Sequence, residues 1–412
     1  MAEISPFKAI RPTRDKVHLV AARPYYTYKE NVLKAKLEDN PFTFLHIINP
    51  EFGGKKKTEP NSPERFALVS DAYHEFIDKE ILTQDPDPHL YLYRQTKDGH
   101  EYMGVVGGAS VKEYREDSIK KHEATLTSRE AMFTNYLNIV GYNAEPVLLS
   151  YSDVQNQIDP LLYNKVKDRP EYEYTTTDLI KHELWVFNED ESQAVINAFE
   201  QLDSLYICDG HHRSASSAGL KQWREKNGQG HFANEDFFLA FFLNEKRLHI
   251  LEFNRLIKTM NGLSTDQLIE RLSKDFSVEP MLIGENPTKE HEITMCVKGD
   301  WFKLCCKSEI IDNSHPVKCL DADILTSYVL EPILGISDLK TDDNIEFISG
   351  KQELRDAELK ILSGKFDVGF FLYPIGIDEI KRVADNKLIM PPKSTWVEPK
   401  LRSGLTIYNI NE

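Results

Sequence analysis

The sequence lacks the marks of a secreted or membrane-embedded protein. Its longest apolar run, Phe237–Leu243, is far shorter than the roughly 20 residues that a membrane-spanning helix needs. None of its five cysteines stands in a Cys-x-x-Cys pair, and its first residues show no signal-peptide pattern. We therefore expect a cytoplasmic chain with no membrane partner and no structural disulfide.

An excess of basic residues is also missing. Lys and Arg number 50 against 66 Asp and Glu, which gives a formal net charge of -16. A chain of this charge does not neutralise the phosphates of DNA or RNA, so we expect no nucleic-acid partner. An anionic small molecule would need a local group of cations that acts against the overall field.

The most informative stretch that the chain does contain is Cys208-Asp209-Gly210-His211-His212-Arg213. Apolar residues 205–207 precede it and small residues 214–218 follow, a pattern that predicts a buried strand, a tight turn and a helix. Asp209 would cap this helix, and Gly210 would permit the turn. The first N–H groups of a helix attract anions, and two imidazoles and a guanidinium lie beside them here. We interpret the stretch as a phosphate-handling centre.

The alternative is an ordinary Asp-Gly turn followed by a solvated helix start. The chain contains its own comparison, because Asp98-Gly99-His100 lies between the aromatic-rich segments 91–93 and 102–104. That context predicts a hairpin turn without chemistry. The strand–turn–helix context of Asp209 favours a function there. Gly53-Gly54-Lys55-Lys56-Lys57 lacks the spacing of a phosphate-binding loop, and we predict a solvated loop.

A second group of candidates lies between Asp117 and Ile139, which we predict to be one amphipathic helix. On it His122 and Arg129 would share a face with apolar residues, with Glu123 beside that face. In the functional interpretation Glu123 is a general base, while His122 and Arg129 bind a phosphate or carboxylate. The alternative is a buried histidine and a surface Glu–Arg pair.

The end of the chain supplies further candidates. The stretch from Met390 to Lys400 is too rich in proline for a regular element and predicts a rigid, extended loop. Its two cations and two hydroxyls could close over a phosphate or carboxylate; they are Lys393, Ser394, Thr395 and Lys400. The alternative is a Pro-rich closing segment with solvated lysines. Arg255, on a predicted strand over 248–257, is either an anion ligand or part of an edge salt bridge.

Several of these stretches, in this order, resemble the bacterial "domain of unknown function 1015" family over nearly the whole chain: Asn40-Pro41, Asn49-Pro50-Glu51, His122-Glu123 with Arg129, Asp209 to Arg213, and Met390 to Thr395. The central motif is also similar to that of the ParB/sulfiredoxin superfamily. Its free-serine kinases carry Asp-Gly-His-Thr-Arg, in which only His212 differs here. Sulfiredoxins have a reactive Cys where this chain has His211, so their chemistry is not expected. Family members often carry His where this chain has Asn254, which weakens a role for Arg255.

The resemblance implies an α+β protein with a ParB/sulfiredoxin-like nucleotide-binding core. Residues 1–260 would form the catalytic domain. A change of character near Asn261 predicts a second α+β domain over 261–412, which would contribute a closing loop at 390–405.

The function implied is a phosphotransferase acting on serine or phosphoserine, with Mg²⁺ and an adenine nucleotide as donor or acceptor. Asp209, His211, Arg213 and Glu123 would be catalytic. The phosphate or substrate would be bound by Gly210, His212, His122, Arg129, Arg255, Lys393, Ser394, Thr395 and Lys400. Two alternatives stay open: a phosphoserine phosphatase that forms a phosphohistidine on His211, and a non-catalytic sensor of a nucleotide or phosphorylated metabolite. The direction of transfer, the metal ligands and the oligomeric state also stay open.

Overall fold

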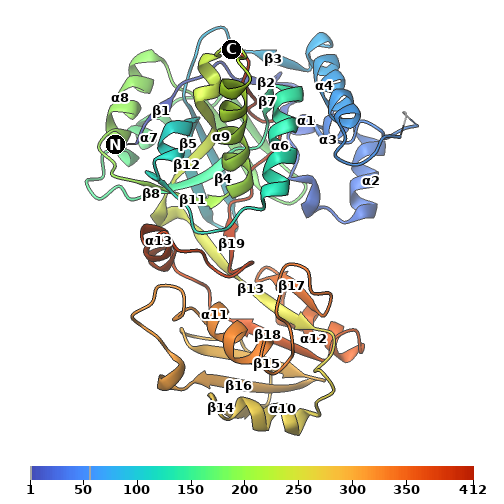
Figure 1. The fold of residues 1–412 in the computed structure, drawn as a ribbon. Coiled ribbons are helices and arrows are strands. Elements are labelled where there is room, and N and C mark those ends of the chain that lie inside the picture. Colours follow the sequence, from blue (N-terminus) through green and yellow to red (C-terminus); the bar gives the residue numbers. More distant parts are fainter. Residues whose placement is uncertain (1, 55–56) are drawn as a thin grey trace. The chain divides into compact units, whose positions relative to one another are not determined.

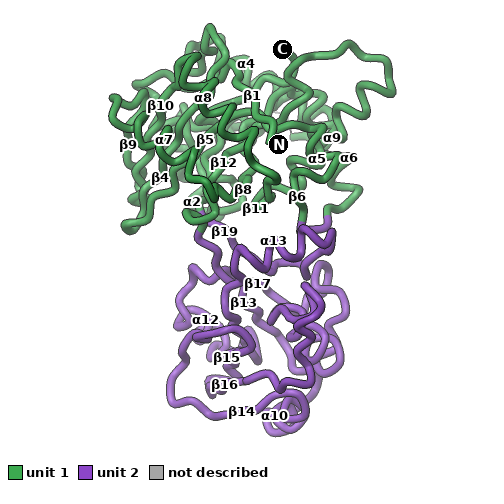
Figure 2. The backbone as a smooth tube through the Cα atoms, turned by 90° about the vertical axis from the view of Figure 1, so that its left-hand side faces the viewer, with its two compact units in different colours: residues 1–121, 125–248, 399–412 green, residues 122–124, 249–398 purple. Residues whose placement is uncertain are grey.

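The computed structural model describes residues 2–54 and 57–412, which form two compact units (Figure 2). Unit 1 contains the chain up to residue 121, residues 125–248 and residues 399–412, and unit 2 contains residues 122–124 and 249–398. The division between the units therefore falls at 248/249 and not at 260/261. No Gly or Pro marks this point, because the chain there runs directly into a strand. The predicted loop 53–57 falls partly outside the described residues.

Unit 1 is built on a mixed sheet that, in the described ranges, has nine strands (Figure 1). From one edge to the other the order is β6 (Ile119–Lys120), β11 (Leu205–Asp209), β8 (Val147–Tyr151), β12 (Phe237–Asn244), β5 (His100–Ser110), β4 (Tyr91–Lys97), β10 (Lys181–Val186) and β9 (Tyr172–Thr175), while β1 (Ile4–Ser5) pairs with β5. Strands β8 and β12 are apolar apart from Ser150 and Asn244, and they contribute Leu149, Ala240 and Phe242 to the main core. Such a near-continuous apolar run is typical of a strand covered on both faces.

Helices cover this sheet, and α6 (Thr127–Val140) and α9 (His211–Lys226) lie side by side (Figure 1). The close approach depends on Gly219, since a Cβ there would lie 2.7 Å from Thr134 Oγ1. The other helices of unit 1 are α1 (Val17–Val20), α2 (Glu30–Asp39), α3 (Leu45–Ile48), α4 (Pro63–Asp78), α5 (Val111–Arg115), α7 (Asp159–Lys165) and α8 (Glu189–Phe199). Two small pairs complete the unit: β2 (Ile10–Pro12) with β3 (Leu82–Gln84), and β7 (Tyr142–Asn143) with β20 (Tyr408–Asn409). The second pair returns the end of the chain to unit 1.

Unit 2 is built on a sheet with seven strands among the described residues. Their order is β14 (Phe276–Met281), β16 (Asp300–Cys306), β15 (Glu292–Val297), β18 (Val368–Leu372), β13 (His249–Ile257) and β17 (Ile345–Ser349), and β19 (Thr395–Glu398) pairs with the first half of β13. Its helices are α10 (Thr265–Leu272), α11 (Asp321–Leu325), α12 (Leu354–Leu362) and α13 (Ile377–Asp385). Both units mix helices with a largely antiparallel sheet, so the predicted α+β class is confirmed.

Two local predictions are confirmed and two are wrong. The strand–turn–helix around Asp209 and the hairpin turn at Asp98-Gly99 form as expected. The predicted single helix over 117–139 is instead the short strand β6, a loop and α6. Residues 119 and 120 pair in parallel with β11 and so belong to the sheet. This contact is long-range, and the helical spacing of apolar residues gives no information about it. The stretch from Met390 to Lys400 is likewise not wholly irregular, because Thr395–Glu398 forms the strand β19. These four residues lie between the prolines, so each of them keeps the backbone N–H group that strand pairing needs.

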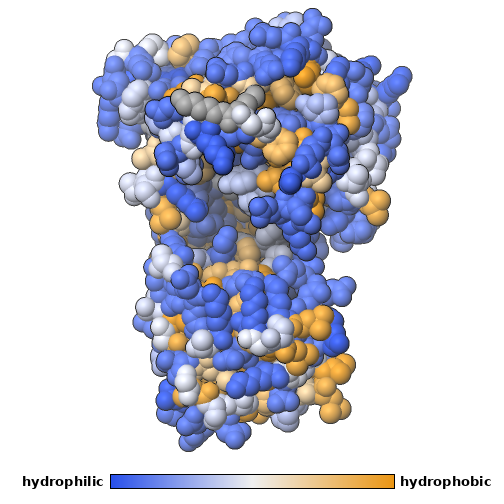
Figure 3. Space-filling model, turned by 90° about the vertical axis from the view of Figure 1, so that its right-hand side faces the viewer, coloured by the Kyte–Doolittle hydropathy of each residue, from blue (hydrophilic) through white to orange (hydrophobic). Residues whose placement is uncertain are grey.

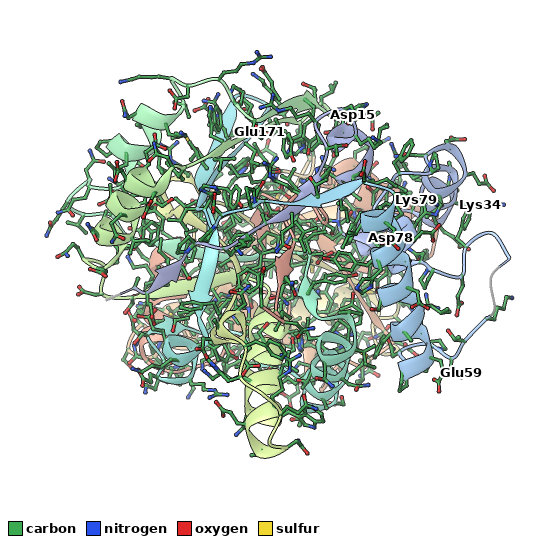
Figure 4. The ribbon with its side chains drawn as sticks, turned by 90° about the horizontal axis from the view of Figure 1, so that it is seen from above. Asp15, Lys34, Glu59, Asp78, Lys79 and Glu171 are labelled. Atoms are coloured by element: carbon green, nitrogen blue, oxygen red, sulfur yellow. The ribbon has the colours of Figure 1, made fainter. Side chains whose placement is uncertain are left out.

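The surface agrees with the acidic, polar composition. The face shown in Figure 3 is mostly hydrophilic, with hydrophobic residues in scattered patches. Lys34 on α2, and Asp78 and Lys79 at the end of α4, point outward in Figure 4 and are exposed. Among the described helices none is long and apolar enough to cross a lipid bilayer.

Candidate functional site

The turn between β11 and α9 forms the centre of the candidate site in unit 1. Gly210 adopts φ +102°, a conformation that L-residues with side chains rarely take. A Cβ at this position would also lie 2.9 Å from Arg213 Nε. Gly210, and not Asp209 as predicted, is the N-cap residue of α9. Asp209 is the last residue of the strand, which leaves its carboxylate available for other partners.

Those partners are two cations. Lys400 Nζ donates to Asp209 Oδ1 at 3.0 Å, and Arg213 Nη2 donates to Asp209 Oδ2 at 2.5 Å. Burial alone would raise the pKa of Asp209, but the charges of Lys400 and Arg213 outweigh burial and lower the pKa to about 2. Asp209 is therefore ionised at neutral pH, and it holds both cations beside the start of α9.

Arg213 is fixed from a second side. Its Nη1 donates to the backbone oxygen of Pro146 at 2.7 Å and lies 3.7 Å from the carboxylate of Glu145. Burial alone would lower the pKa of Arg213, but the carboxylates of Asp209 and Glu145 raise it above its ordinary value. The guanidinium is thus charged and oriented before any ligand arrives, which is the state that a phosphate clamp requires.

The two histidines of the motif differ in exposure. His211 is 4% exposed, whereas His212 is only partly buried. His211 begins α9, and its charge also helps to lower the pKa of Asp209. The structure therefore brings together Asp209, Gly210, His211, His212, Arg213 and Lys400 in one part of unit 1.

Two residues that sequence reasoning missed belong to the same neighbourhood. Glu145 accepts a hydrogen bond from Ser403 Oγ at 2.7 Å and so links the Arg213 region to the C-terminal segment. Tyr26 is 56% exposed as a residue, yet burial of its hydroxyl and the nearby charge of Asp209 raise its pKa. Neither position stands in a recognisable motif, and long-range contacts such as the pairing of Ala22 with Ser403 bring their segments to the site.

The residues predicted to share one helical face do not do so. His122 and Glu123 lie in the loop after β6 and belong to unit 2, whereas Arg129 is exposed in the first turn of α6 in unit 1. The spacing argument for Glu123 as a base is therefore wrong. His122 is 3% exposed, and burial lowers its pKa to about 4, so it is neutral at pH 7 and offers no charge to an anion.

In unit 2 the remaining candidates meet along β13 and β19. Arg255 is fully buried, and its Nη2 donates to the backbone oxygen of Lys393 at 3.3 Å. Ser394 Oγ donates to Pro391 O at 2.7 Å, and Thr395 is the partner of Glu252 in the ladder. Burial lowers the pKa of Arg255 to about 9 despite the charge of Asp321. Arg255 and Ser394 thus brace the closing segment from within.

The chain belongs to the family described as "Protein of unknown function (DUF1015)", whose model matches residues 4–323. No functionally curated protein matches the sequence.

Distant likenesses to solved structures are also found. The chain is similar to a free serine kinase in complex with AMP at 14% identity and a TM-score of 0.36, over 70% of this chain and 89% of the kinase. It is similar to a conserved hypothetical protein from Pyrococcus furiosus at 15% identity and a TM-score of 0.36, over 70% and 91%. For C-terminally truncated SbnI from Staphylococcus aureus the values are 13%, 0.39, 74% and 87%. TM-scores at this level do not by themselves define a shared fold.

Proposed function

We propose that the protein is a phosphotransferase that moves a phosphoryl group between an adenine nucleotide and serine or phosphoserine. The observation that carries the proposal is the turn at Gly210, where the start of α9 meets two fixed cations, Arg213 and Lys400. The first N–H groups of an α-helix have no partner within the helix and bind phosphate oxygens readily. Phosphoryl transfer depends chiefly on such positioning and charge stabilisation.

In this proposal each group near Gly210 has a distinct task. Arg213 and Lys400, both held by Asp209, present their remaining N–H groups to the phosphate. Arg213, whose planar fork matches phosphate oxygens, clamps the transferring group. His211 donates a hydrogen bond that offsets developing negative charge. His212 and the backbone of Gly210 contact the remaining oxygens.

Mg²⁺ belongs to the proposal as the ion that would accompany the nucleotide. The ion is usually held by one or two carboxylates together with substrate phosphates and water. Asp209 is ionised at neutral pH, and Glu145 offers a second carboxylate on the other side of Arg213. When bound, Mg²⁺ would neutralise charge on the nucleotide phosphates.

The serine part of the proposal depends on the likeness of Asp209–Arg213 to the free-serine kinase motif. Glu123 is exposed in its loop, and without the helical spacing no observation supports it as the base, so the proposal names no base in the kinase direction. Lys393, Thr395 and Arg129 remain proposed contacts to the substrate carboxylate or to outer phosphates. Arg255 and Ser394 are better suited to positioning the closing segment than to direct contact, because both are buried and bonded to its backbone.

The ParB/sulfiredoxin-like assignment of the core, with residues 390–405 as a closing segment, belongs to the same proposal. The phosphohistidine alternative uses the same residue, His211, and differs in its products, because it would release free phosphate without a nucleotide.

Phosphorus NMR on the full chain with Mg²⁺ and phosphoserine, with and without ADP or AMP, tests the function. Loss of the phosphoserine signal only when nucleotide is present supports phosphotransfer. Loss to free phosphate without nucleotide would replace the proposal by a phosphatase. No change in the spectrum, together with calorimetric binding of nucleotide or phosphoserine, would replace it by the sensor.

A further inference from the structure

Three side chains that the proposed function does not use meet in unit 2. They are His291, just before β15, Cys306, the last residue of β16, and Asp321, the first residue of α11. One potential ligand atom from each lies within 4.8 Å of the other two, a grouping found by a search of the described residues. His291 Nδ1 and Asp321 Oδ1 are 3.1 Å apart. Two ligands at about 2.0 Å from one tetrahedral zinc ion would be roughly 3.3 Å apart, so this pair already has nearly the required spacing.

The backbone holds the three residues in this arrangement. The N–H of Cys306 donates to the backbone oxygen of His291 at 2.9 Å, and the N–H of His291 donates to Asp321 Oδ1 at 3.0 Å. His291 also adopts φ +65°, the left-handed conformation, just before the start of β15. The three potential metal ligands therefore come from three chain segments, and hydrogen bonds fix the positions of these segments relative to one another.

The surroundings carry an excess of negative charge. Asp321 is 7% exposed, and Glu290 and Glu379 line a small pocket together with Asp321 and His291. The nearby cation Arg382 donates to Cys319 Sγ at 2.7 Å. Several carboxylates thus face one small pocket, and a divalent cation would offset their charge.

We propose that His291, Cys306 and Asp321 bind a zinc ion whose fourth coordination position is open to this pocket. The donor set selects the metal. Thiolate and imidazole ligands suit zinc, whereas Mg²⁺ and Ca²⁺ prefer oxygen ligands throughout. Three protein ligands with one open position distinguish this arrangement from a closed structural site of four ligands. The site lies within unit 2.

Cobalt is the probe for the test, because Co²⁺ takes the geometry of zinc and its bond to a thiolate gives a charge-transfer band in the near ultraviolet. Co²⁺ is titrated into reduced, chelator-treated full-length protein, and then Zn²⁺ is added. The expected result is one cobalt ion per chain, a charge-transfer band and its loss on addition of Zn²⁺. Absence of the band in the wild-type protein would overturn the proposal.

The neighbouring cysteine supplies a matched control. Consecutive strand residues point to opposite faces, so Cys305 faces away from the site. C306S should abolish the band, and C305S should keep it. A band that persists in folded C306S, or that is lost in C305S and not in C306S, would refute the site. Should C306S fail to fold, D321N and H291Q take its place, each with an expected loss of cobalt affinity of roughly tenfold or more. Unchanged affinity in both would refute the proposal equally.

Discussion

Replacing Asp209 by Asn tests whether Lys400 and Arg213 are held by an ionised carboxylate. The pKa of Asp209 falls from the ordinary 3.8 to about 2 in the folded chain. Since one pKa unit corresponds to about 1.4 kcal/mol, ionised Asp209 contributes roughly 2 kcal/mol to folding at pH 7. D209N removes this contribution and leaves both cations without their shared partner. We therefore expect its free energy of unfolding to fall by at least this amount.

The sign of the pH dependence follows from the direction of the pKa change. A carboxyl group with a lowered pKa stabilises the fold above about pH 4, and the contribution is lost as the pH falls toward 2. The difference between wild type and D209N should thus be equal at pH 7 and pH 5 and shrink only below about pH 4.

Urea unfolding followed by circular dichroism measures this difference, and D98N is the matched control. Asp98 precedes the other Asp-Gly-His sequence, its side chain is 81% exposed, and its φ of +51° suits Asn equally well. D98N should change the free energy of unfolding by less than about 0.5 kcal/mol. A D209N protein as stable as wild type at pH 7 would refute the electrostatic account of the turn.

Two further predictions concern buried charges. Arg224 and Glu235 form a buried ion pair at 3.1 Å, with side chains 4% and 3% exposed, so R224M should lower the free energy of unfolding in urea by about 3–5 kcal/mol. K79M, which removes an exposed pair with Glu75, should lower it by less than about 1 kcal/mol. Equal losses in the two variants would contradict the role of burial. The pKa of His122 is lowered from 6.5 to about 4, so as the pH falls the unfolded chain binds a proton before the folded chain does. The wild-type protein should therefore lose roughly 3 kcal/mol of stability between pH 6.5 and 4, and H122Q should not show this loss. Parallel pH profiles for the two proteins would show that His122 is not held neutral.

Local sequence predicted the motif at Asp209 because every feature of that turn is local. An apolar run, one Gly and a run of small residues suffice to specify a strand, a positive φ and a helix start. The partners of the motif could not be found in the same way. Glu145 and Tyr26 reach Arg213 and Asp209 only through tertiary pairing, and neither belongs to a spacing pattern.

The wrong prediction for the segment 117–139 has a related cause. Apolar residues at helical spacing occurred across a strand, a loop and a helix, and pairing of Ile119 and Lys120 with β11 decided the conformation. Similarly, the grouping of His291, Cys306 and Asp321 joins residues up to 30 positions apart, and no cysteine–histidine spacing in the sequence indicates it. Sequence patterns thus located the local turn, and long-range pairing determined which side chains surround it.

The most direct test of the central claim compares two histidines that each follow an Asp-Gly pair. His211 begins α9 at the proposed phosphate site, whereas His100 is an exposed residue of the β4–β5 hairpin. H211Q and H100Q are assayed for nucleotide-dependent loss of phosphoserine by phosphorus NMR, after circular dichroism has confirmed that both are folded. The account predicts that H211Q abolishes turnover and that H100Q retains the wild-type rate. Near-normal turnover by H211Q would contradict the claim that the turn at Gly210 handles the transferring phosphate.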